Sequence, residues 1–283
     1  MTLSPGAAPR VGHAWIEPAP VHALAALFDD GAPIPARGEP LPPLWHWVAL
    51  AQWFGALDTG PDGHQTVGRN LPDVGKPRRM FAGGRVEVVR DILIGEDVRR
   101  EDHVLAVIPK SGRKGDFVLV QVATSIFDAH GRLAIREWQD LIYRDLPPGA
   151  DGVAPAPQPA KPVVPALLRR ANDGWIFETD PTKLLRFSGA TSNGHRIHYD
   201  HQYATQVEGY PDLVVHGPLM TLALAEVLRL ESHRSPPRVL THRALRPLFC
   251  GQSACIELQA REDGAEATVQ TADGTHSVLL AGG

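Results

Sequence analysis

Residues 187–200 carry the side chains best suited to acid–base chemistry in this sequence. The run reads Phe-Ser-Gly-Ala-Thr-Ser-Asn-Gly-His-Arg-Ile-His-Tyr-Asp and is too polar and too glycine-broken for a hydrophobic core. Imidazole has the side-chain pKa nearest neutrality, so His195 and His198 are candidate proton carriers. Serine, threonine, asparagine and aspartate also cap helices, so a capped helix start is the alternative interpretation of the same run.

The length and the charge of the chain limit its classes of function. With 283 residues it exceeds the common single-domain size, which predicts two domains or one duplicated domain. The formal net charge of -4 gives no basic field for nucleic acid or for an anionic membrane. The sequence shows no secretion signal and no long apolar run, so we expect a cytoplasmic protein without nucleic-acid or membrane partners.

The two cysteines, Cys250 and Cys255, indicate neither a disulfide framework nor a metal site. Their spacing is not that of a zinc ligand pair. Small hydrophobic core positions are the role expected for both of them. We therefore expect no metal ligand set and no bound cofactor.

A proline-rich segment divides the chain. Residues 147–165 carry a proline at almost every second or third position, and proline removes backbone donors and fixes φ. We expect this segment to be an extended linker between a first unit, residues 1–146, and a second unit, residues 166–283. The similar patterns of residues 90–95 and 246–251 suggest that the two units arose by duplication.

Each unit is predicted to contain one long apolar helix followed by strands that pair in sequence. The helices are expected at 44–57 and 219–230, and the second is apolar on nearly every face, so a sheet must surround it. This is an α+β double hot dog arrangement, two repeats that each wrap an antiparallel sheet around a central helix. The expected strands are 84–89, 97–110, 117–128 and 133–143 in the first unit and 239–248, 253–262, 265–271 and 276–280 in the second.

Two motifs of the second unit resemble a known enzyme family. Residues 187–200, followed by Val-His-Gly-Pro-Leu at 215–219, resemble the MaoC-like (R)-specific enoyl-CoA hydratases. The resemblance is closest to the mesaconyl-C4-CoA (3-methylfumaryl-CoA) hydratase and hydroxyacyl-thioester dehydratase branch. Residues 41–47, 83–87 and 137–144 look like the non-catalytic repeat of that branch. The resemblance therefore covers nearly the whole chain and implies the double hot dog fold.

The resemblance implies a lyase that adds water to the double bond of a short unsaturated acyl-CoA. The expected substrate is dicarboxylic, of the mesaconyl-C4-CoA or itaconyl-CoA type, and whether the protein forms a homo-oligomer stays open. Three alternatives also stay open: a 3-hydroxyacyl-thioester dehydratase of fatty-acid metabolism, a hot dog acyl-CoA thioesterase, and a non-catalytic acyl-CoA-binding scaffold.

The motif departs from the family pattern at the position of the second acid–base group. The family has Gly-Asp-x-Asn-Pro-Leu-His, whereas this chain has Asn193 for the aspartate, His195 for the asparagine and Arg196 for the proline. His198 keeps the register and is the acid–base group that the resemblance implies. An amide can orient water but cannot transfer a proton at neutral pH. Among the nearby ionisable residues, His195 and Asp200 are the candidate replacements, and the sequence does not choose between them.

The chemistry also needs donors for the negative charge that collects on the thioester oxygen. Gly217, just after His216, begins the apolar helix, and the unpaired N–H groups of a helix start can bind such an oxygen. An ordinary helix start, with Pro218 in its first turn, is the alternative interpretation.

Arginines are the expected ligands for a second carboxylate or for the CoA phosphates, because a guanidinium binds such groups with two hydrogen bonds. Arg196 lies within the motif, and the other candidates flank the strands expected in the two units. These others are Arg78, Arg79, Arg85, Arg243 and Arg246.

Overall fold

The computed structural model describes residues 8–65, 71–112, 115–146, 164, 166–172, 174–232 and 236–282. In the first half the strands are β1 (Arg10–Trp15), β2 (Arg78–Val88), β3 (Asp97–Gly112), β4 (Gly115–Phe127) and β5 (Leu133–Arg144). In the second half they are β6 (Leu168–Ala171), β7 (Gly174–Phe177), β8 (Val239–Ala244), β9 (Ala254–Arg261), β10 (Gly264–Thr271) and β11 (Gly274–Gly282). The eight strands expected from the sequence correspond to β2–β5 and β8–β11.

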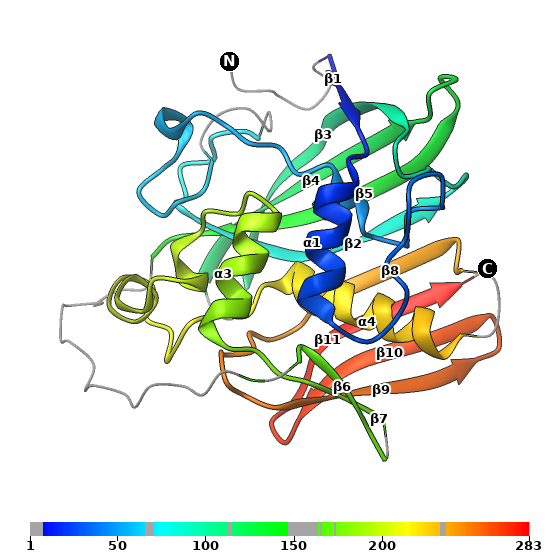
Figure 1. Ribbon diagram of the computed structural model, residues 1–283. Helices are drawn as coiled ribbons and strands as arrows, with labels where there is room; N and C mark the ends of the chain where they lie inside the picture. Colours follow the sequence, from blue (N-terminus) through cyan, green and yellow to red (C-terminus); the bar gives the residue numbers. More distant parts are fainter. Residues whose placement is uncertain are drawn as a thin grey trace.

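These strands form one antiparallel sheet in the order β1-β3-β4-β5-β2-β8-β11-β10-β9-β7-β6 (Figure 1). The two halves meet where β2 pairs with β8, with Gly84 opposite His242. Read outward from this seam, each half repeats the same order, because β5, β4 and β3 on one side match β11, β10 and β9 on the other. The two halves thus share one continuous sheet. Most of the expected linker, including 147–163, lies outside the described residues, so the unit boundaries stay a prediction.

Helices cover the concave side of the sheet. They are α1 (Pro18–Phe28), α2 (His46–Ala49), α3 (Pro181–Ala190) and α4 (Gly217–Glu231), with 3-10 turns at Ala56–Asp58 and Arg196–His198 and a π-helical turn at Tyr203–Val207. Figure 1 shows α1 and α3 side by side in front of α4, and α1 and α3 are in contact. Among the described residues no helix is long and apolar enough to cross a membrane.

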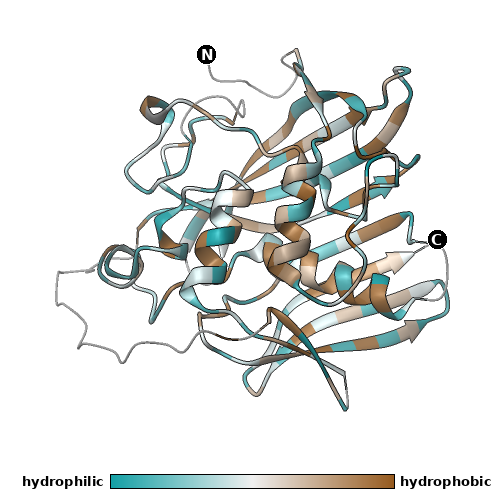
Figure 2. Ribbon diagram, in the orientation of Figure 1, coloured by the Kyte–Doolittle hydropathy of each residue, from teal (hydrophilic) through white to brown (hydrophobic). Residues whose placement is uncertain are grey.

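The helix expected at 219–230 is confirmed as α4. Its residues 219–228 are all buried, and it packs on β2, β9, β10 and β11. Figure 2 shows its hydrophobic character beside the alternating bands of the strands. Burial on all faces explains why the sequence of this helix has no polar stripe.

The helix expected at 44–57 is wrong. Only the four residues of α2 are helical there, and Leu44 just before them has a φ of 68° in the left-handed region. Trp45 Nε1 donates to Glu226 Oε2 (3.1 Å), and Trp47 Nε1 donates to Glu137 Oε1 (2.9 Å). These contacts to two other elements compensate for a short helix, since aromatic residues favour helices only weakly.

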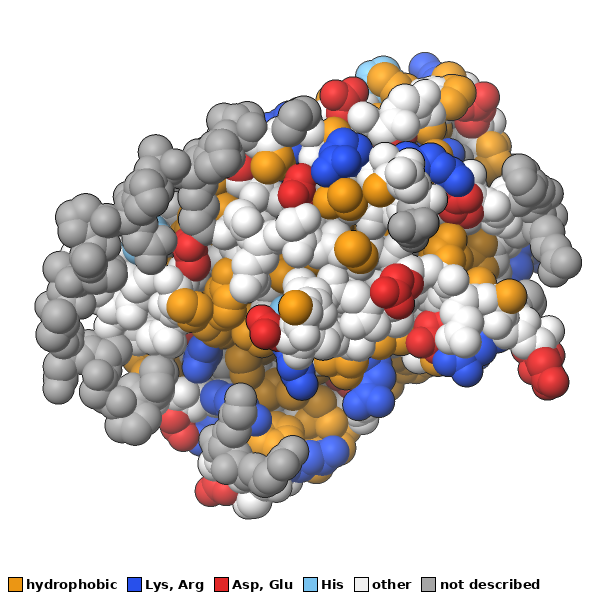
Figure 3. All heavy atoms as spheres, turned by 90° about the horizontal axis from the view of Figure 1, so that it is seen from below, with side chains coloured by type: hydrophobic (Ala, Val, Ile, Leu, Met, Phe, Trp, Pro, Cys, Tyr) orange, Lys and Arg blue, Asp and Glu red, His pale blue; other side chains and the backbone are white. Residues whose placement is uncertain are grey.

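The two cysteines differ in environment. Cys250 is buried as expected, but Cys255 is exposed, so the core position expected for Cys255 is wrong. It lies on β9, where Leu258 is also 39% exposed. Figure 3 shows hydrophobic side chains at the surface among Lys and Arg side chains. Apolar residue type alone therefore does not decide which face of a strand is buried.

Candidate active site

A cavity of about 540 Å3 lies between the two halves of the chain. Residues 191–195, 197–198 and the start of α4 line it from the second half, while β2, β3, β4 and β5 line it from the first. Its His, Arg, Asp and Glu residues are His46, His64, Arg78, Arg79, Arg100, Asp102, Glu137, Arg144, His195, His198 and Arg246.

His198 is held as a neutral imidazole at the edge of this cavity. Its Nδ1 lies 2.7 Å from the carbonyl oxygen of Val214, which can only accept, so Nδ1 carries the proton and Nε2 is left as the acceptor. Burial and the nearby His195 lower the pKa of His198 to about 3. The side chain is therefore neutral at neutral pH, and its Nε2 can accept a hydrogen bond from a bound group.

His195 is buried and belongs to a charged network. Its Nε2 donates to Glu208 Oε1 (3.1 Å), and Glu208 Oε2 forms an ion pair with Arg78 Nε (2.6 Å). Glu208 is only 2% exposed, so its charge depends on these two partners. The sequence gives no signal for Glu208, because it is distant from the motif and becomes a neighbour only through the turn at Tyr203–Val207.

Asn193 lines the cavity beside these histidines. Its Oδ1 accepts a hydrogen bond from the backbone N–H of His195 (3.1 Å). The amide oxygen is thus engaged within the loop, and the NH2 group is the part of the side chain that can donate to a ligand.

The structure separates Arg196 and Asp200 from the cavity, which neither side chain lines. Arg196 Nη2 pairs with Asp200 Oδ2 (2.7 Å), and Asp200 Oδ1 accepts from the backbone N–H of Tyr203 (3.0 Å). Arg196 also donates to the carbonyl oxygen of Pro61. In this structure both residues fasten the loop, and the roles expected for them from the sequence stay predictions. Of the two candidates to replace the missing carboxylate, only His195 reaches the cavity.

The residues at the start of α4 have different surroundings. Gly217 lines the cavity, and a Cβ at this position would lie 2.8 Å from Phe81 Cδ1 on β2. His216 is fully buried, stacks on His198 with ring centroids 3.6 Å apart, and has its Nε2 2.9 Å from Ser188 Oγ. His216 does not line the cavity, so the thioester contact expected for it is wrong and its role is to support the ring of His198.

The arginines expected to bind the substrate differ in whether they line the cavity and in whether they already have a partner. Arg85 pairs with Glu87, Arg243 is exposed, and neither lines the cavity, so the contacts expected for them stay predictions. Arg246 lines the cavity and donates to the carbonyl oxygen of Asp273. Arg79 also lines the cavity, and no carboxylate among the described residues pairs with it. Arg78 lines the cavity as well, and its guanidinium forms an ion pair with Glu208.

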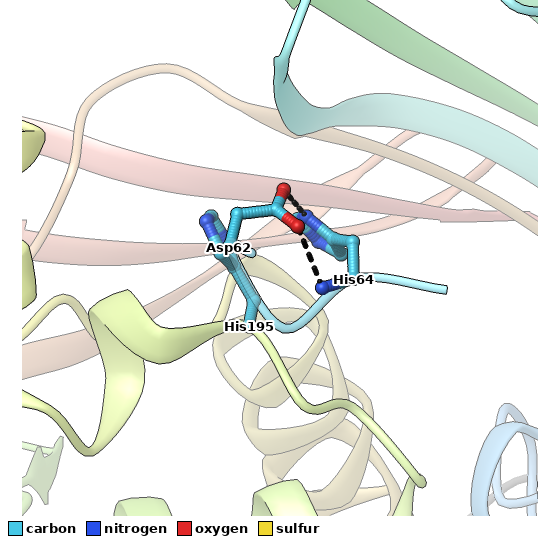
Figure 4. A group of neighbouring side chains, drawn as sticks. All are labelled: Asp62, His64 and His195. Atoms are coloured by element: carbon cyan, nitrogen blue, oxygen red, sulfur yellow. Dashed lines mark hydrogen bonds and ion pairs between the residues drawn. The ribbon is translucent and has the colours of Figure 1, made fainter. Parts of the chain in front are cut away.

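Sequence reasoning missed a histidine from the first half. His64 lines the cavity, and its Nδ1 donates to Asp62 Oδ2 (2.8 Å), as Figure 4 shows. Its ring lies 3.9 Å from the ring of His195, centroid to centroid. The only local signal is the Asp-Gly-His order, which predicts a turn and gives no hint of the neighbour from the second half.

The end of the cavity formed by the first half is also polar. Glu137 Oε2 accepts from His46 Nε2 (3.1 Å), and its Oε1 accepts from Trp47 and Gln139. Burial alone would raise the pKa of Glu137, but the hydrogen bond and charge of His46 outweigh burial and lower it. This carboxylate therefore stays ionised and fixes the donors around it.

A second polar group lies on β3 and β4 at the same end. Arg100 Nε donates to both carboxylate oxygens of Asp102 (2.9 and 3.0 Å), and Thr124 donates to Asp102 Oδ1 (2.6 Å). All three residues line the cavity. This end of the cavity is thus built from satisfied polar groups as well as apolar ones.

Comparison with known proteins shows the family of the chain. Residues 44–250 match the model of the family described as hydroxyacyl-thioester dehydratase type 2. The chain is 41% identical over 243 residues to mesaconyl-C(4)-CoA hydratase of Chloroflexus aurantiacus, which covers 86% of this chain and 82% of the relative.

Two solved structures from Mycobacterium tuberculosis share the fold. HtdX matches with a TM-score of 0.65 at 16% identity, covering 98% of this chain and 100% of the other. A protein described as having a double hot dog fold matches with a TM-score of 0.55 at 16% identity, covering 98% and 95%. The expected double hot dog fold is confirmed. The chain belongs to the hydroxyacyl-thioester dehydratase type 2 family and is a hydro-lyase.

Proposed function

We propose that this enzyme adds water to the double bond of a short, dicarboxylic, α,β-unsaturated acyl-CoA of the mesaconyl-C4-CoA or itaconyl-CoA type. The observation that carries the proposal is one cavity lined by a neutral imidazole, a helix start and an arginine that no carboxylate of the described residues pairs with, namely His198, Gly217 and Arg79. The 41% identity to a mesaconyl-C(4)-CoA hydratase supports the substrate class.

His198 holds and activates the attacking water in this proposal. Its Nε2 is an acceptor, because Nδ1–H is committed to Val214. An acceptor that holds the water in the orientation for attack lowers the entropic cost of the step. His216, stacked behind it, keeps the ring in one orientation.

Gly217 brings the thioester carbonyl to the start of α4. The first N–H groups of a helix lack partners within the helix, and the helix dipole favours negative charge there. The charge that develops on the thioester oxygen during hydration is then stabilised by these donors. A side chain at position 217 would meet Phe81, so glycine keeps the backbone accessible.

Arg79 binds the second carboxylate of the substrate. It takes the role that the sequence assigned to Arg196, whose guanidinium is committed to Asp200 and Pro61. An arginine that lines a cavity without an internal carboxylate is suited to an anionic ligand, since the ligand completes its hydrogen bonds.

The test is a panel of thioesters assayed by loss of enoyl absorbance and by release of free thiol. Mesaconyl-C4-CoA and itaconyl-CoA are expected to be hydrated at least about tenfold more efficiently than crotonyl-CoA, and Arg79→Gln is expected to abolish that preference. Thiol release without hydration would establish a thioesterase. Binding without any reaction would establish a scaffold, and a preference for long-chain enoyl-CoA would favour the fatty-acid dehydratase.

A further inference from the structure

The motif loop lacks the carboxylate that would share proton transfer with His198. Asn193 stands in its place and cannot carry a proton at neutral pH. Hydration, however, needs water to lose a proton and the α-carbon of the substrate to gain one. The Nε2 of His195, the other histidine of the loop, is bonded to Glu208, so we look to another part of the chain for the group that carries this proton.

We infer that the Asp62–His64 pair, supplied by the first half of the chain, is this proton carrier. The inference rests on the proposed hydratase function and deepens it. It also means that the half expected to be non-catalytic completes the active site.

The geometry of the pair suits a base. Asp62 Oδ2 accepts from His64 Nδ1 (2.8 Å), so Nε2 of His64 is the nitrogen left to accept a proton. Asp62 Oδ1 also accepts from the backbone N–H of His64 (2.9 Å), which fixes the carboxylate against the ring. A carboxylate that orients an imidazole in this way sets its tautomer and stabilises its protonated form.

The pair is docked on the motif loop by backbone contacts. The N–H of Arg196 donates to the carbonyl oxygen of Asp62 (2.9 Å). A Cβ at Gly63 would lie only 1.8 Å from the carbonyl oxygen of Gly194, so the two loops touch backbone to backbone. His64 thereby sits against His195, which lies next to His198 with ring centroids 5.6 Å apart.

The surroundings of His64 favour a neutral resting state. The charged and titratable groups that face it are Asp62, Arg79 and His195. Burial and the charge of Arg79 lower the pKa of His64 well below its ordinary value, while burial raises and His64 lowers the pKa of Asp62, with a net value of about 2. The resting pair is then a neutral imidazole beside an ionised carboxylate, which is a base.

The proton that leaves the water passes to His64 and ends on the α-carbon of the substrate. Water binds between the two imidazoles, and one O–H group donates to His198 Nε2. The other O–H bond breaks as the oxygen bonds to the β-carbon, and its proton goes to His64 Nε2 while the π electrons move toward the thioester oxygen. The imidazolium, paired with Asp62, then returns that proton to the α-carbon as the enolate collapses.

Asp62 decides which imidazole carries the proton. The carboxylate bears a negative charge that stabilises an imidazolium at His64. The partner of His198 Nδ1 is the carbonyl of Val214, which has no net charge. His64 therefore holds the proton during the reaction, and His198 positions the water.

The test compares His64→Gln and Asp62→Asn with the matched control His130→Gln, an exposed histidine outside the cavity. His64→Gln is expected to lower kcat by about 10²- to 10³-fold with KM changed less than about threefold, and imidazole should restore part of the rate to His64→Ala. Asp62→Asn is expected to move the acidic limb of the kcat profile to lower pH, because the imidazolium loses its partner. His130→Gln should behave as the unmodified enzyme.

The outcomes separate this inference from the proposed function. An unmodified enzyme that hydrates none of the panel would overturn the proposed function itself. An active enzyme whose His64→Gln variant keeps its rate, or whose Asp62→Asn variant keeps its acidic limb, would overturn only the role of the pair. The donor atoms of Asp62, His64 and His195 lie within 4.8 Å of one another. Activity that is lost with EDTA and regained with Zn²⁺ would assign them to a metal and also overturn the inference.

Discussion

The two halves of the molecule differ most in the segment that precedes the strand at the seam. In the second half, α4 precedes β8 as a 15-residue helix that fills the concave side of the sheet. In the first half, residues 44–57 precede β2, yet only the four residues of α2 are helical, and Leu50, Ala51, Gln52 and Phe54 line the cavity instead. One half thus supplies a core helix and a helix start, and the other supplies space for a ligand.

The difference arises because the polar groups of the two segments find their hydrogen-bond partners in different places. Residues 219–228 are buried against the sheet on all sides, so helical hydrogen bonds are the available way to pair their backbone. Trp45 and Trp47 instead bind carboxylates on α4 and β5 through their indole N–H groups. A segment held by such anchors does not need a long helix, and its later residues, 50–52 and 54, line the cavity.

The largest effect is expected for His198→Ala, at the end of the cavity beside α4. Loss of the imidazole should lower kcat by about 10²- to 10⁴-fold without unfolding the protein. The matched variant in the other region, His46→Gln on α2, should change kcat by less than about tenfold, since His46 is committed to Glu137. Steady-state kinetics and a thermal melt of each variant measure this, and equal losses in the two variants would remove the distinction between the regions.

The next largest effect is a difference in the free energy of unfolding between a variant in α4 and a variant in residues 44–57. Leu222→Ala in α4 opens a void in a fully buried core and should cost about 2–5 kcal/mol in the free energy of unfolding. Leu50→Ala should cost roughly half as much or less, because Leu50 already lines a cavity and no new void is closed off. Urea unfolding of both variants checks the ranking, which is wrong if Leu50→Ala is the more destabilising.

The smallest of the three effects is the loss of stability at low pH that His242 causes at the seam between β2 and β8. His242 on β8 is buried, stacks on Phe81, and has no hydrogen-bond partner for its ring nitrogens within the described residues. Burial lowers the pKa of His242 to about 4, only partly opposed by Glu137 and Asp140. The unfolded chain binds a proton below about pH 6.5 and the folded chain does not, so stability falls as the pH drops from about 6.5 toward 4.

His242→Phe should therefore reduce the pH dependence of the unfolding free energy by up to about 1.4 kcal/mol per pH unit over that range. Urea unfolding at pH 7.5, 6 and 5 gives the slope, with His130→Gln as the exposed control. An unchanged slope in His242→Phe would show that this histidine is not held neutral.

The sequence predicted the elements whose patterns are local. The strands β2–β5 and β8–β11 alternate clearly, and α4 is apolar over more than two turns, so both follow from periodicity. The failure at 44–57 has a different origin, because the carboxylates that hold Trp45 and Trp47 lie on other elements. Long-range polar anchors of this kind leave no trace in a local pattern.

The site was predictable only where a contiguous motif carried it. His198, His195, Asn193 and Gly217 all line the cavity, as their closeness in the sequence suggested. Arg79, one of the arginines expected from the sequence, also lines the cavity. His64 reaches it only through the contact of its loop with the motif loop, and Glu208 approaches His195 only through the π-helical turn. Arg196 and Asp200 do not line the cavity, because proximity in sequence does not show which way a side chain points.

The contact between Gly63 and Gly194 restricts how the halves of this enzyme can be exchanged. A Cβ at Gly63 would strike the carbonyl oxygen of Gly194, and a Cβ at Gly194 would lie 2.5 Å from the carbonyl oxygen of Gly63. Gly63 also has a φ of 83°, which a residue with a side chain rarely adopts. A chimera that joins the first half of a relative to the second half of this chain will therefore keep the two loops in register only where both positions are glycine.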